Sequence, residues 1–599
     1  MMILWSNLLI WVGLTGFCTI QAQTQKLPDN LLWSSGAAGI SNSQQIKKVS
    51  KEGIFVDSWL SFPRTLLTLG PAAHPKLKKA IRDNQWALTS RDNVGGVFPL
   101  LASQWATGLD KRTVYYRIDP LARWSDGHKV SAKDFYFSWQ SIKSKHWPDP
   151  WQRQWSLEHI EQVKIYDQNT ISVTMRHMTA NLLQRTNLTP LPSHFIKKVD
   201  PSYVKKYNWK IIPNTGPYQI NEISKDRGFI SFKRKNNWWA KNRLRHQHQF
   251  NAEIVRFVAL PDEEVIWEAF KRKKLSIIKL KDLTLFNKRT RDPLFKNGGG
   301  TLEYWSGLPA PCYGIWINSE KASWLSKNLK EGISHSFNFQ RVNLGLLQNK
   351  GKRLKGCFDG YGPWSIYRQF PKFDEKTAQK LFMEAGWRTR NGEGIRISNQ
   401  RALTLKIMFG DELDYNQLLI LQQEAKKTGL KIELEQVKSE KFLERLKTGD
   451  YEAVFAGFAP WQTNPQFQLI WHSKGIGQGT NFSRINNQEL DRMINQYDAE
   501  LSYQVRLKLA HNIQNKAYDL GWFIPGLHGG WQRSVFWRWW RLPVPSAPRP
   551  SPTPWDHFHP SYGGLFWYDS KLERAMGNPR EKAGISPREK IVDKTWYRD

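Results

Sequence analysis

The amino-acid sequence predicts an α/β protein that is large enough for more than one buried core. Hydrophobic side chains make up 40% of its 599 residues, which suffices to build sizeable cores over this length. Between residues 403 and 457, strand-like runs alternate with amphipathic helical runs, as in a lobe built around a central sheet. The first half instead predicts pairs of strands joined by short polar turns. Together these patterns favour an α/β fold divided into several parts.

The composition excludes several classes of protein. Aromatic residues make up 13% of the chain and include 30 Trp, whereas disordered chains are poor in aromatics. Three Cys are too few for a disulfide scaffold. Mean hydropathy is −0.59 and no apolar run of about 18 residues follows the N-terminal segment, which excludes a polytopic membrane protein. The Trp excess is a candidate ligand surface, because aromatic faces stack on peptides and sugars.

The charge is strongly basic. Lys and Arg number 88 against 53 Asp and Glu, which gives a formal net charge of +35. Such a charge suits nucleic acid, an anionic membrane surface or an acidic ligand. The basic residues are scattered, however, and no zinc-finger, helix-turn-helix or RNA-binding signature accompanies them. We interpret the charge as a solvated basic surface and expect no nucleic-acid partner.

The N-terminal segment predicts export. Residues 3–20 are apolar and end near a plausible signal-peptidase site after Ala22, so we expect 1–22 to be a cleaved signal peptide. An uncleaved membrane anchor is the alternative, because no Lys or Arg precedes the apolar run. Phe17 before Cys18 argues against a lipoprotein anchor, which requires a small residue at that position.

Export implies an oxidising compartment, which bears on the remaining cysteines. If Cys18 leaves with the signal peptide, Cys312 and Cys357 remain. We interpret this pair as a structural disulfide, with two free thiols as the alternative. No CxxC motif and no neighbouring His accompany them, so a metal or redox role is weakly supported.

Local signals define the elements of the first half. The run at residues 53–62 predicts a short strand and loop, and VYYRID at 114–119 predicts a second strand. Ser131 is a good helix N-cap with Asp134 three residues on, which predicts a helix over 131–142. Further elements are strand pairs within 160–175 and 218–233 and a helix over 262–274.

The second half alternates strands with helices. Gly429 is placed to end a helix over 415–427, because glycine readily adopts the left-handed conformation of a helix C-terminus. Strands are predicted at 312–318, 403–409, 430–437 and 451–457, and helices at 324–337, 376–385 and 440–446.

The C-terminal region predicts irregular structure. Residues 543–560 hold seven Pro, so we expect an extended connector or a loop wrapped on the surface. Residues 570–599 are polar and charged, which predicts a loose tail.

A series of motifs identifies a family. PLLASQW (99–105), ARWSDG (122–127) and VSAKDFYFSW (130–139) come first, and TGPY, NWW, YEAVFAGF and IPGLH follow at 215–218, 237–239, 451–458 and 524–528. As a set, in order and spacing across about 100–530, they resemble the family 5 extracellular solute-binding proteins, the substrate-binding components of peptide-type ABC importers. The helix at 264–271 and the segments at 531–537 and 563–569 resemble the oligopeptide and microcin C-type members.

The resemblance implies a two-lobed periplasmic-binding-protein fold with a ligand cleft between the lobes. The first lobe would span 23–310, with an inserted subdomain at about 63–205, and the second α/β lobe would span 311–520. The chain would return to the first lobe at 521–569 with the Pro-rich segment, before the polar tail. The motifs ARWSDG and TGPY contain tight turns, and we interpret them as architectural rather than ligand-binding.

The sequence departs from the family at one point. Members often carry an acidic residue just after the cleft strand, where it pairs with the α-ammonium group of a peptide. Here no Asp or Glu lies between Asp450 and Glu489 except Glu452, which is inside the predicted strand. A blocked, modified or internally gripped ligand therefore fits better, as does an acidic ligand drawn by positive charge. Packing between the lobes is the alternative role for Trp461.

The resemblance implies a set of ligand-contacting residues in both lobes. Core packing is the alternative role for those of the first lobe. The candidates are Trp59, Ser61, Phe62, Trp316, Asn318, Phe458, Trp461, Gln462 and Asn464.

The expected function is capture of oligopeptides or peptide-like compounds in the periplasm and their delivery to the permease subunits of an ABC importer, by a monomer without a cofactor. An oligosaccharide or muropeptide ligand in a Trp-rich cleft is the alternative. We expect no catalysis, because no G-x-S-x-G, HExxH or Walker motif occurs. Lone pairs such as His246/His248 and His557/His559 are weak metal candidates, and we predict no metal site.

Overall fold

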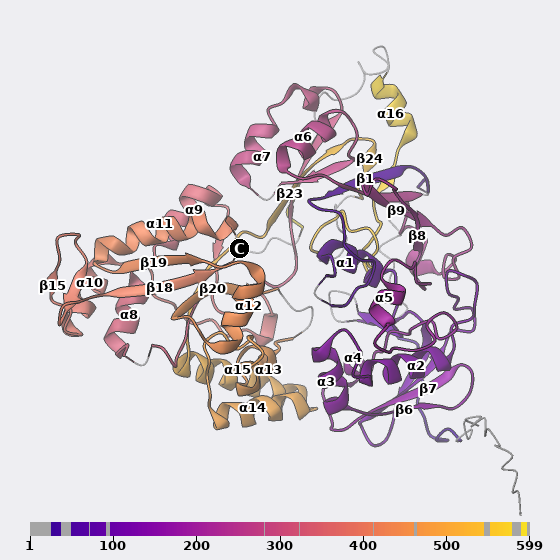
Figure 1. The fold of residues 1–599 in the computed structure, drawn as a ribbon, viewed down its shortest axis with the longest axis horizontal. Helices are drawn as coiled ribbons and strands as arrows, with labels where there is room; N and C mark the ends of the chain where they lie inside the picture. The colour runs from indigo at the N-terminus through magenta and orange to yellow at the C-terminus, as the bar shows by residue number, and fades with distance from the viewer. Residues whose placement is uncertain are drawn as a thin grey trace, which may run out of the picture.

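The computed structural model describes residues 26–36, 49–70, 72–91, 96–280, 282–322, 324–410, 412–459, 464–543, 551–577 and 589–595. The chain forms two lobes of mixed α/β structure, with the second lobe on the left of Figure 1 and the first on the right. The predicted signal peptide lies outside the described residues. Within the described ranges, no helix combines the length and the apolar character needed to cross a membrane.

Two four-stranded sheets form the body of the first lobe. In the first, β1 pairs in parallel with β10, and the order is β1-β10-β9-β8. In the second, the order is β11-β23-β12-β26, so strands from three distant parts of the chain meet. The strands are β1 Ile54–Trp59, β8 Tyr218–Ile223, β9 Phe229–Arg234, β10 Ile254–Ala259, β11 Ile277–Lys279, β12 Gly299–Trp305, β23 Trp531–Trp537 and β26 Glu589–Asp593, with α1 Pro75–Asp83, α6 Glu263–Lys271, α7 Leu283–Arg289 and α16 Ser570–Gly577 beside them.

An antiparallel sheet of order β4-β5-β7-β6 forms the inserted subdomain at the lower right of Figure 1. Its helix α2 begins as the sequence predicts, because the backbone N–H of Ser131 donates to Asp134 Oδ2 at 2.9 Å. The predicted strand pair around residues 160–175 is also confirmed. The elements are β2 Thr89–Arg91, β3 Val97–Pro99, β4 Ala102–Thr107, β5 Thr113–Ile118, β6 Ile160–Ile165, β7 Thr170–Met175, α2 Ala132–Lys143, α3 Pro150–His159, α4 Leu182–Arg185 and α5 Tyr203–Tyr207.

A five-stranded sheet of order β19-β18-β20-β13-β21 forms the core of the second lobe. The predicted strand–helix alternation is confirmed, and Gly429 ends α11 with a φ of 94°. The strands are β13 Cys312–Ile317, β18 Thr404–Phe409, β19 Lys431–Gln436, β20 Ala453–Phe458 and β21 Trp522–Pro525; the helices are α8 Lys327–His335, α9 Phe339–Leu347, α10 Glu375–Glu384, α11 Glu412–Thr428, α12 Ser439–Thr448, α13 Phe467–Ile470, α14 Gln488–Ala499 and α15 Tyr503–Leu520. Short strands complete the chain: β14 Lys352–Arg353, β15 Thr389–Arg390, β16 Arg396–Ser398, β17 Arg401–Ala402, β22 Leu527–His528, β24 Trp540–Arg541 and β25 Trp567–Tyr568.

The C-terminal region differs from the sequence prediction in three ways. First, β21 pairs with β13, so the chain returns to the first lobe after Pro525 and not at 521. Second, residues 551–566 have no regular structure, as expected, but they run through the first-lobe core rather than over the surface, with Trp555 and Phe566 at most 1% exposed. Third, the described parts of the tail are regular rather than loose, because residues 570–577 form α16 and β26 adds a strand parallel to β12.

Candidate functional site

The lobes are joined by two neighbouring crossings of the chain. The chain leaves the first lobe after Trp305, enters the second at Cys312, and comes back between Pro525 and Trp531. The crossings touch, because the backbone N–H of Ser306 donates to the carbonyl of Gly530 at 3.3 Å. Two adjacent crossings form a hinge about which two lobes can open and close.

Polar contacts link the lobes on one side of the hinge. Lys350, just after α9 in the second lobe, lies 2.7 Å from Glu303 on β12 in the first. Glu303 also accepts from Arg533 at 3.3 Å. Burial raises the pKa of Glu303, but Lys350 and then Arg533 outweigh that effect and hold it below its usual value. The carboxylate is therefore charged and bridges cations of both lobes.

A second contact links the inserted subdomain to α14 of the second lobe. Arg185 donates to Asp498 Oδ2 at 3.0 Å, and the backbone N–H of Ala180 donates to the carbonyl of Asp498 at 3.1 Å. The lobes thus touch both near the hinge and far from it. This is a closed arrangement.

The second-lobe wall of the boundary contains the predicted cleft strand. β20 ends at Phe458, which pairs with Cys312 at the start of β13 and stacks on Phe482 at 4.7 Å. Cys312 is joined to Cys357 in a disulfide, which fixes the chain beside this strand end. Trp461 and Gln462 lie outside the described residues. Asn464 is buried and donates to the hydroxyl of Tyr497 at 3.4 Å.

Three predicted contact residues lie in the cores in this conformation, which favours a packing role for them. Trp59 is 1% exposed and stacks on Phe257. Trp316 is fully buried, and its Nε1 donates to the carbonyl of Ala456 at 3.1 Å. Asn318 is also fully buried, and its amide donates to the backbone carbonyls of two residues just before β20. None of the three offers an exposed atom to a ligand in this conformation.

Two predicted residues of the first lobe do reach the surface. Ser61 is exposed, and Phe62 is half-buried. Phe62 stacks on Trp209 with the ring centres 6.2 Å apart. In the part of the chain that the structure describes, more than half of the Trp serve the cores, since fifteen of them are buried.

Sequence reasoning missed two arginines at the lobe boundary. Arg506 on α15 is buried, and its guanidinium lies 4.4 Å from the ring centre of Tyr497. Arg91 ends β2 in the inserted subdomain and is half-buried. A single Arg in a helical or strand pattern carries no signal of its own, so only the tertiary structure identifies them.

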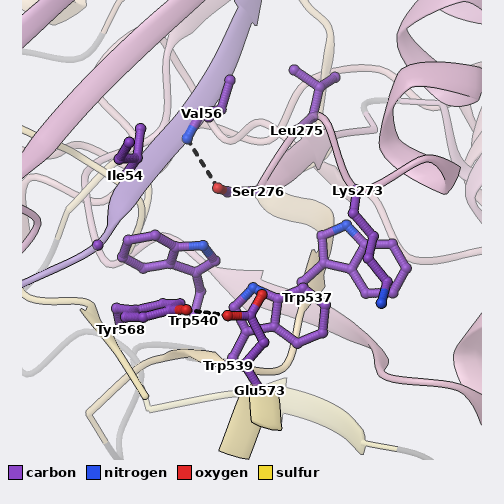
Figure 2. A pocket seen from close by; sticks show the side chains of 11 residues that line it. Ile54, Val56, Lys273, Leu275, Ser276, Trp537, Trp539, Trp540, Tyr568 and Glu573 are labelled. Carbon is purple, nitrogen blue, oxygen red and sulfur yellow. Dashed lines mark hydrogen bonds between the residues drawn. The ribbon is translucent and has the colours of Figure 1, made fainter. Parts of the chain in front are cut away.

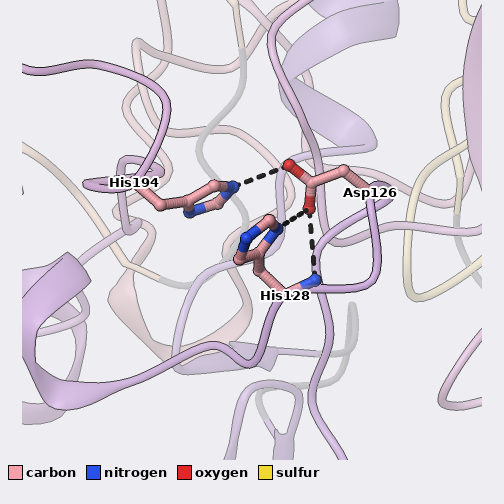
Figure 3. A group of neighbouring side chains, drawn as sticks. All are labelled: Asp126, His128 and His194. Atoms are coloured by element: carbon pink, nitrogen blue, oxygen red, sulfur yellow. Dashed lines mark hydrogen bonds and ion pairs between the residues drawn. The ribbon is translucent and has the colours of Figure 1, made fainter.

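A cluster of Asp126, His128 and His194 lies in the inserted subdomain (Figure 3). Asp126 accepts from His194 at 2.7 Å and lies 3.2 Å from His128 Nδ1, and the two imidazole rings stack with centres 4.1 Å apart. Burial raises the pKa of Asp126, but the hydrogen bonds from His194 and the backbone of His128 lower it further than that. The carboxylate thus ties the ARWSDG turn to the loop at 194, in line with an architectural role.

The His pairs proposed as weak metal candidates are structural. His246 is buried and lies 2.7 Å from Gln249, and His557 is buried 3.3 Å from Asp57.

A cavity of about 360 Å³ lies in the first lobe at the end away from the hinge. Figure 2 shows Trp537, Trp539 and Trp540 around Glu573 and Tyr568 in its wall. In the β12–β23 register, Trp537 pairs with Gly299 while Trp531 pairs with Trp305 at the hinge. Six residues of strand, roughly 20 Å, therefore separate this cavity from the lobe boundary.

Two lobes, a double crossing and contacts that close them define a two-lobed binding protein. Residues 96–479 match the family model for bacterial extracellular solute-binding proteins, family 5 Middle, and the chain belongs to that family.

The chain is similar to several other proteins at low sequence identity. It is 20% identical over 541 residues to the uncharacterized protein YejA of Escherichia coli, which covers 80% of this chain and 83% of that protein. It is 21% identical to the peptidoglycan-binding protein YepA of Agrobacterium fabrum, over 78% of this chain and 83% of that protein. The structure of the oligopeptide-binding protein AppA of Bacillus subtilis, in complex with a nonapeptide, covers 87% of this chain and 100% of that chain, with a TM-score of 0.67 at 15% identity.

Proposed function

We propose that this protein captures oligopeptides or peptide-like compounds between its lobes in the periplasm and delivers them to the permease subunits of an ABC importer. The observation that carries the proposal is the family match over residues 96–479, which spans both lobes and the boundary between them. The nonapeptide complex of the structurally similar AppA supports a peptide of several residues.

Ligand contact is proposed for four of the predicted residues, which border the lobe boundary. Ser61 and Phe62 would line the first-lobe side, and Phe458 and Asn464 the second. Pairing between β20 and β13 ends at Phe458, and Ala459 beyond it is exposed. An extended peptide could take up hydrogen bonds with such backbone past the strand end, which supplies affinity without reading side chains. Trp461 and Gln462 follow directly in the sequence and stay proposed contacts.

The experiment is thermal unfolding of the purified protein with and without a mixed peptide pool. A ligand that binds only the native state stabilises it by about 2.7 kcal/mol at a hundredfold excess over its dissociation constant. We expect the pool to raise the midpoint of unfolding, while the same pool hydrolysed to free amino acids leaves it unchanged. No shift with peptide pools of any length would argue strongly against the proposal.

A peptide-linked cell-wall fragment is the second candidate ligand. It is favoured by the similarity to the peptidoglycan-binding protein YepA. The burial of Trp59 and Trp316 weakens the idea of a Trp-rich sugar site. A muropeptide that stabilises the protein more than its own free stem peptide would favour this candidate.

The contact between Arg185 and Asp498 is expected to favour the closed state. Because both side chains are largely buried, Asp498→Asn should weaken the apparent affinity for a bound peptide by about threefold to tenfold, through a lower population of the closed form. Titration calorimetry measures the affinity, and small-angle scattering measures the opening. The exposed Glu444→Gln in the same lobe is the matched control. Unchanged affinity and shape in Asp498→Asn would show that this pair does not contribute to closure.

A further inference from the structure

Two arginine side chains of opposite lobes lie close enough to interact electrostatically. A chain of contacts places them there: Thr89, at the start of β2, exchanges two hydrogen bonds of 2.9 Å with Asn187. Two residues before Asn187, Arg185 binds Asp498 of the second lobe, which is next to Tyr497. Arg506 lies over Tyr497, and Arg91 ends β2. The first lobe thus presents Arg91 to the part of the second that holds Arg506.

The guanidinium of Arg506 is held rigidly but is incompletely bonded. The residue is 7% exposed, and its Nε donates to the carbonyl of Tyr497 at 3.1 Å. The rings of Tyr497 and Trp364 lie 4.4 and 5.5 Å from its guanidinium carbon. Its Nη2 is buried without a hydrogen-bond partner in the described part of the chain. Such a donor costs free energy until an acceptor reaches it.

The charged side chain of the first lobe that interacts with Arg506 is a cation, Arg91, and not an acid. Burial lowers the pKa of Arg91, and repulsion from Arg506 lowers it further. Asp498, the nearest carboxylate in sequence to Tyr497, is engaged by Arg185. Neither Arg91 nor Arg506 forms an ion pair with any of the described residues. Closing the lobes without a ligand therefore brings together two positive charges that no side chain in the described part of the chain neutralises.

We propose that an anionic group of the ligand, a carboxylate, binds between Arg91 and Arg506 and compensates both charges when the lobes close. This inference rests on the proposed function and names its substrate class: peptides or peptide-like compounds with a carboxylate that reaches this point. Guanidinium groups suit carboxylates because their donors match the two oxygens in a planar arrangement.

The same assignment accounts for the missing acid after β20. A peptide binder that grips the ammonium end needs a carboxylate of its own, and residues 453–488 contain no Asp or Glu. Recognition of the ligand's carboxylate through two arginines would anchor the opposite charge instead. The net charge of +35 agrees with this assignment, because it attracts anionic ligands at long range.

The test compares matched pools of pentapeptides made without Asp or Glu. One pool has free C-terminal carboxylates, a second has C-terminal amides, and a third is amidated but contains one Glu. The proteins compared are the wild type, Arg91→Gln, Arg506→Gln, and Arg64→Gln as an exposed control with the same change in charge. Titration calorimetry gives the affinities, and circular dichroism establishes that each variant is folded. If Arg506→Gln does not fold, because Arg506 is buried, Arg91→Gln still tests the proposal.

We expect the wild type to bind the free-acid pool at least about tenfold more tightly than the amide pool, and Arg91→Gln and Arg506→Gln to lose that preference. Arg64→Gln should bind like the wild type. Binding of the third pool would show that a side-chain carboxylate serves as well as the C-terminal one. Equal affinity of the wild type for all three pools, or an equal loss for acid and amide pools in both variants, would overturn this inference and leave the proposed function standing. Binding of no pool by the wild type would instead overturn both.

Discussion

Replacing Trp555 by alanine is expected to lower the free energy of unfolding of the first lobe by about 3–5 kcal/mol. Trp555 belongs to the Pro-rich segment and is 1% exposed, with its ring packed against Phe55, Phe536 and Phe566. Its Nε1 also donates to Ser534 at 2.9 Å. The substitution therefore removes a large buried side chain and leaves a buried hydroxyl without its donor. Denaturant unfolding followed by circular dichroism measures the loss.

The exposed Trp151 provides the control, since it is 56% exposed. Trp151→Ala should change the free energy of unfolding by less than about 0.5 kcal/mol. Trp555→Phe should lose less than Trp555→Ala, because it keeps most of the packing. If Trp555→Ala were as stable as the control, the Pro-rich segment would not be part of the core.

Replacing Asp57 by asparagine is expected to have the second largest effect and to lower the free energy of unfolding by about 2–4 kcal/mol. Asp57 on β1 is 7% exposed, and its Oδ2 lies 2.9 Å from Lys279 and 3.3 Å from His557 of the Pro-rich segment. Burial raises the pKa of Asp57, but Lys279 and His557 outweigh this and hold it far below its usual value. Asparagine keeps the shape and removes the charge, so Lys279 loses its ionic partner.

The pH dependence follows from the direction of that shift. Since the pKa of Asp57 is depressed in the folded state, its stabilising effect is complete above the unfolded value of about 3.9 and is lost as the pH falls below it. The difference in stability between wild type and Asp57→Asn should therefore shrink below about pH 4. The exposed Glu253→Gln is the control and should show no comparable loss. A difference that stays constant from neutral pH to about pH 2 would contradict this assignment.

Elements with local signals were predictable from the sequence. The helix after Ser131 begins where its capping residues place it, and the strand pairs follow their turn residues. The structure of the C-terminal region was not predictable, because it depends on contacts between residues that are hundreds of positions apart. Glu589 at the start of β26 accepts from Arg538 at 2.9 Å and lies 3.2 Å from Arg541, and this ties the polar tail to the sheet. No local sequence pattern in residues 570–599 predicts these partners.

The candidate site was less predictable, because the choice between core and surface is made by tertiary packing. Trp316 and Asn318 lie two residues apart at the end of β13, yet both side chains are enclosed by β20 and its flanking loop. The arginines of the boundary come from β2 and α15, more than 400 residues apart, and neither has a sequence motif. Their relation exists only in the closed arrangement of the two lobes.

Mass spectrometry of whatever the protein holds after gentle purification tests most directly whether the protein binds peptides or peptide-like compounds. Denaturing the protein should release a peptide or peptide-like compound in a ratio near one per chain, and readdition of that compound should raise the midpoint of unfolding. We predict that the released compound carries a free carboxylate. Release of a compound with no peptide bond, such as a free oligosaccharide, that also restores the stability would contradict it.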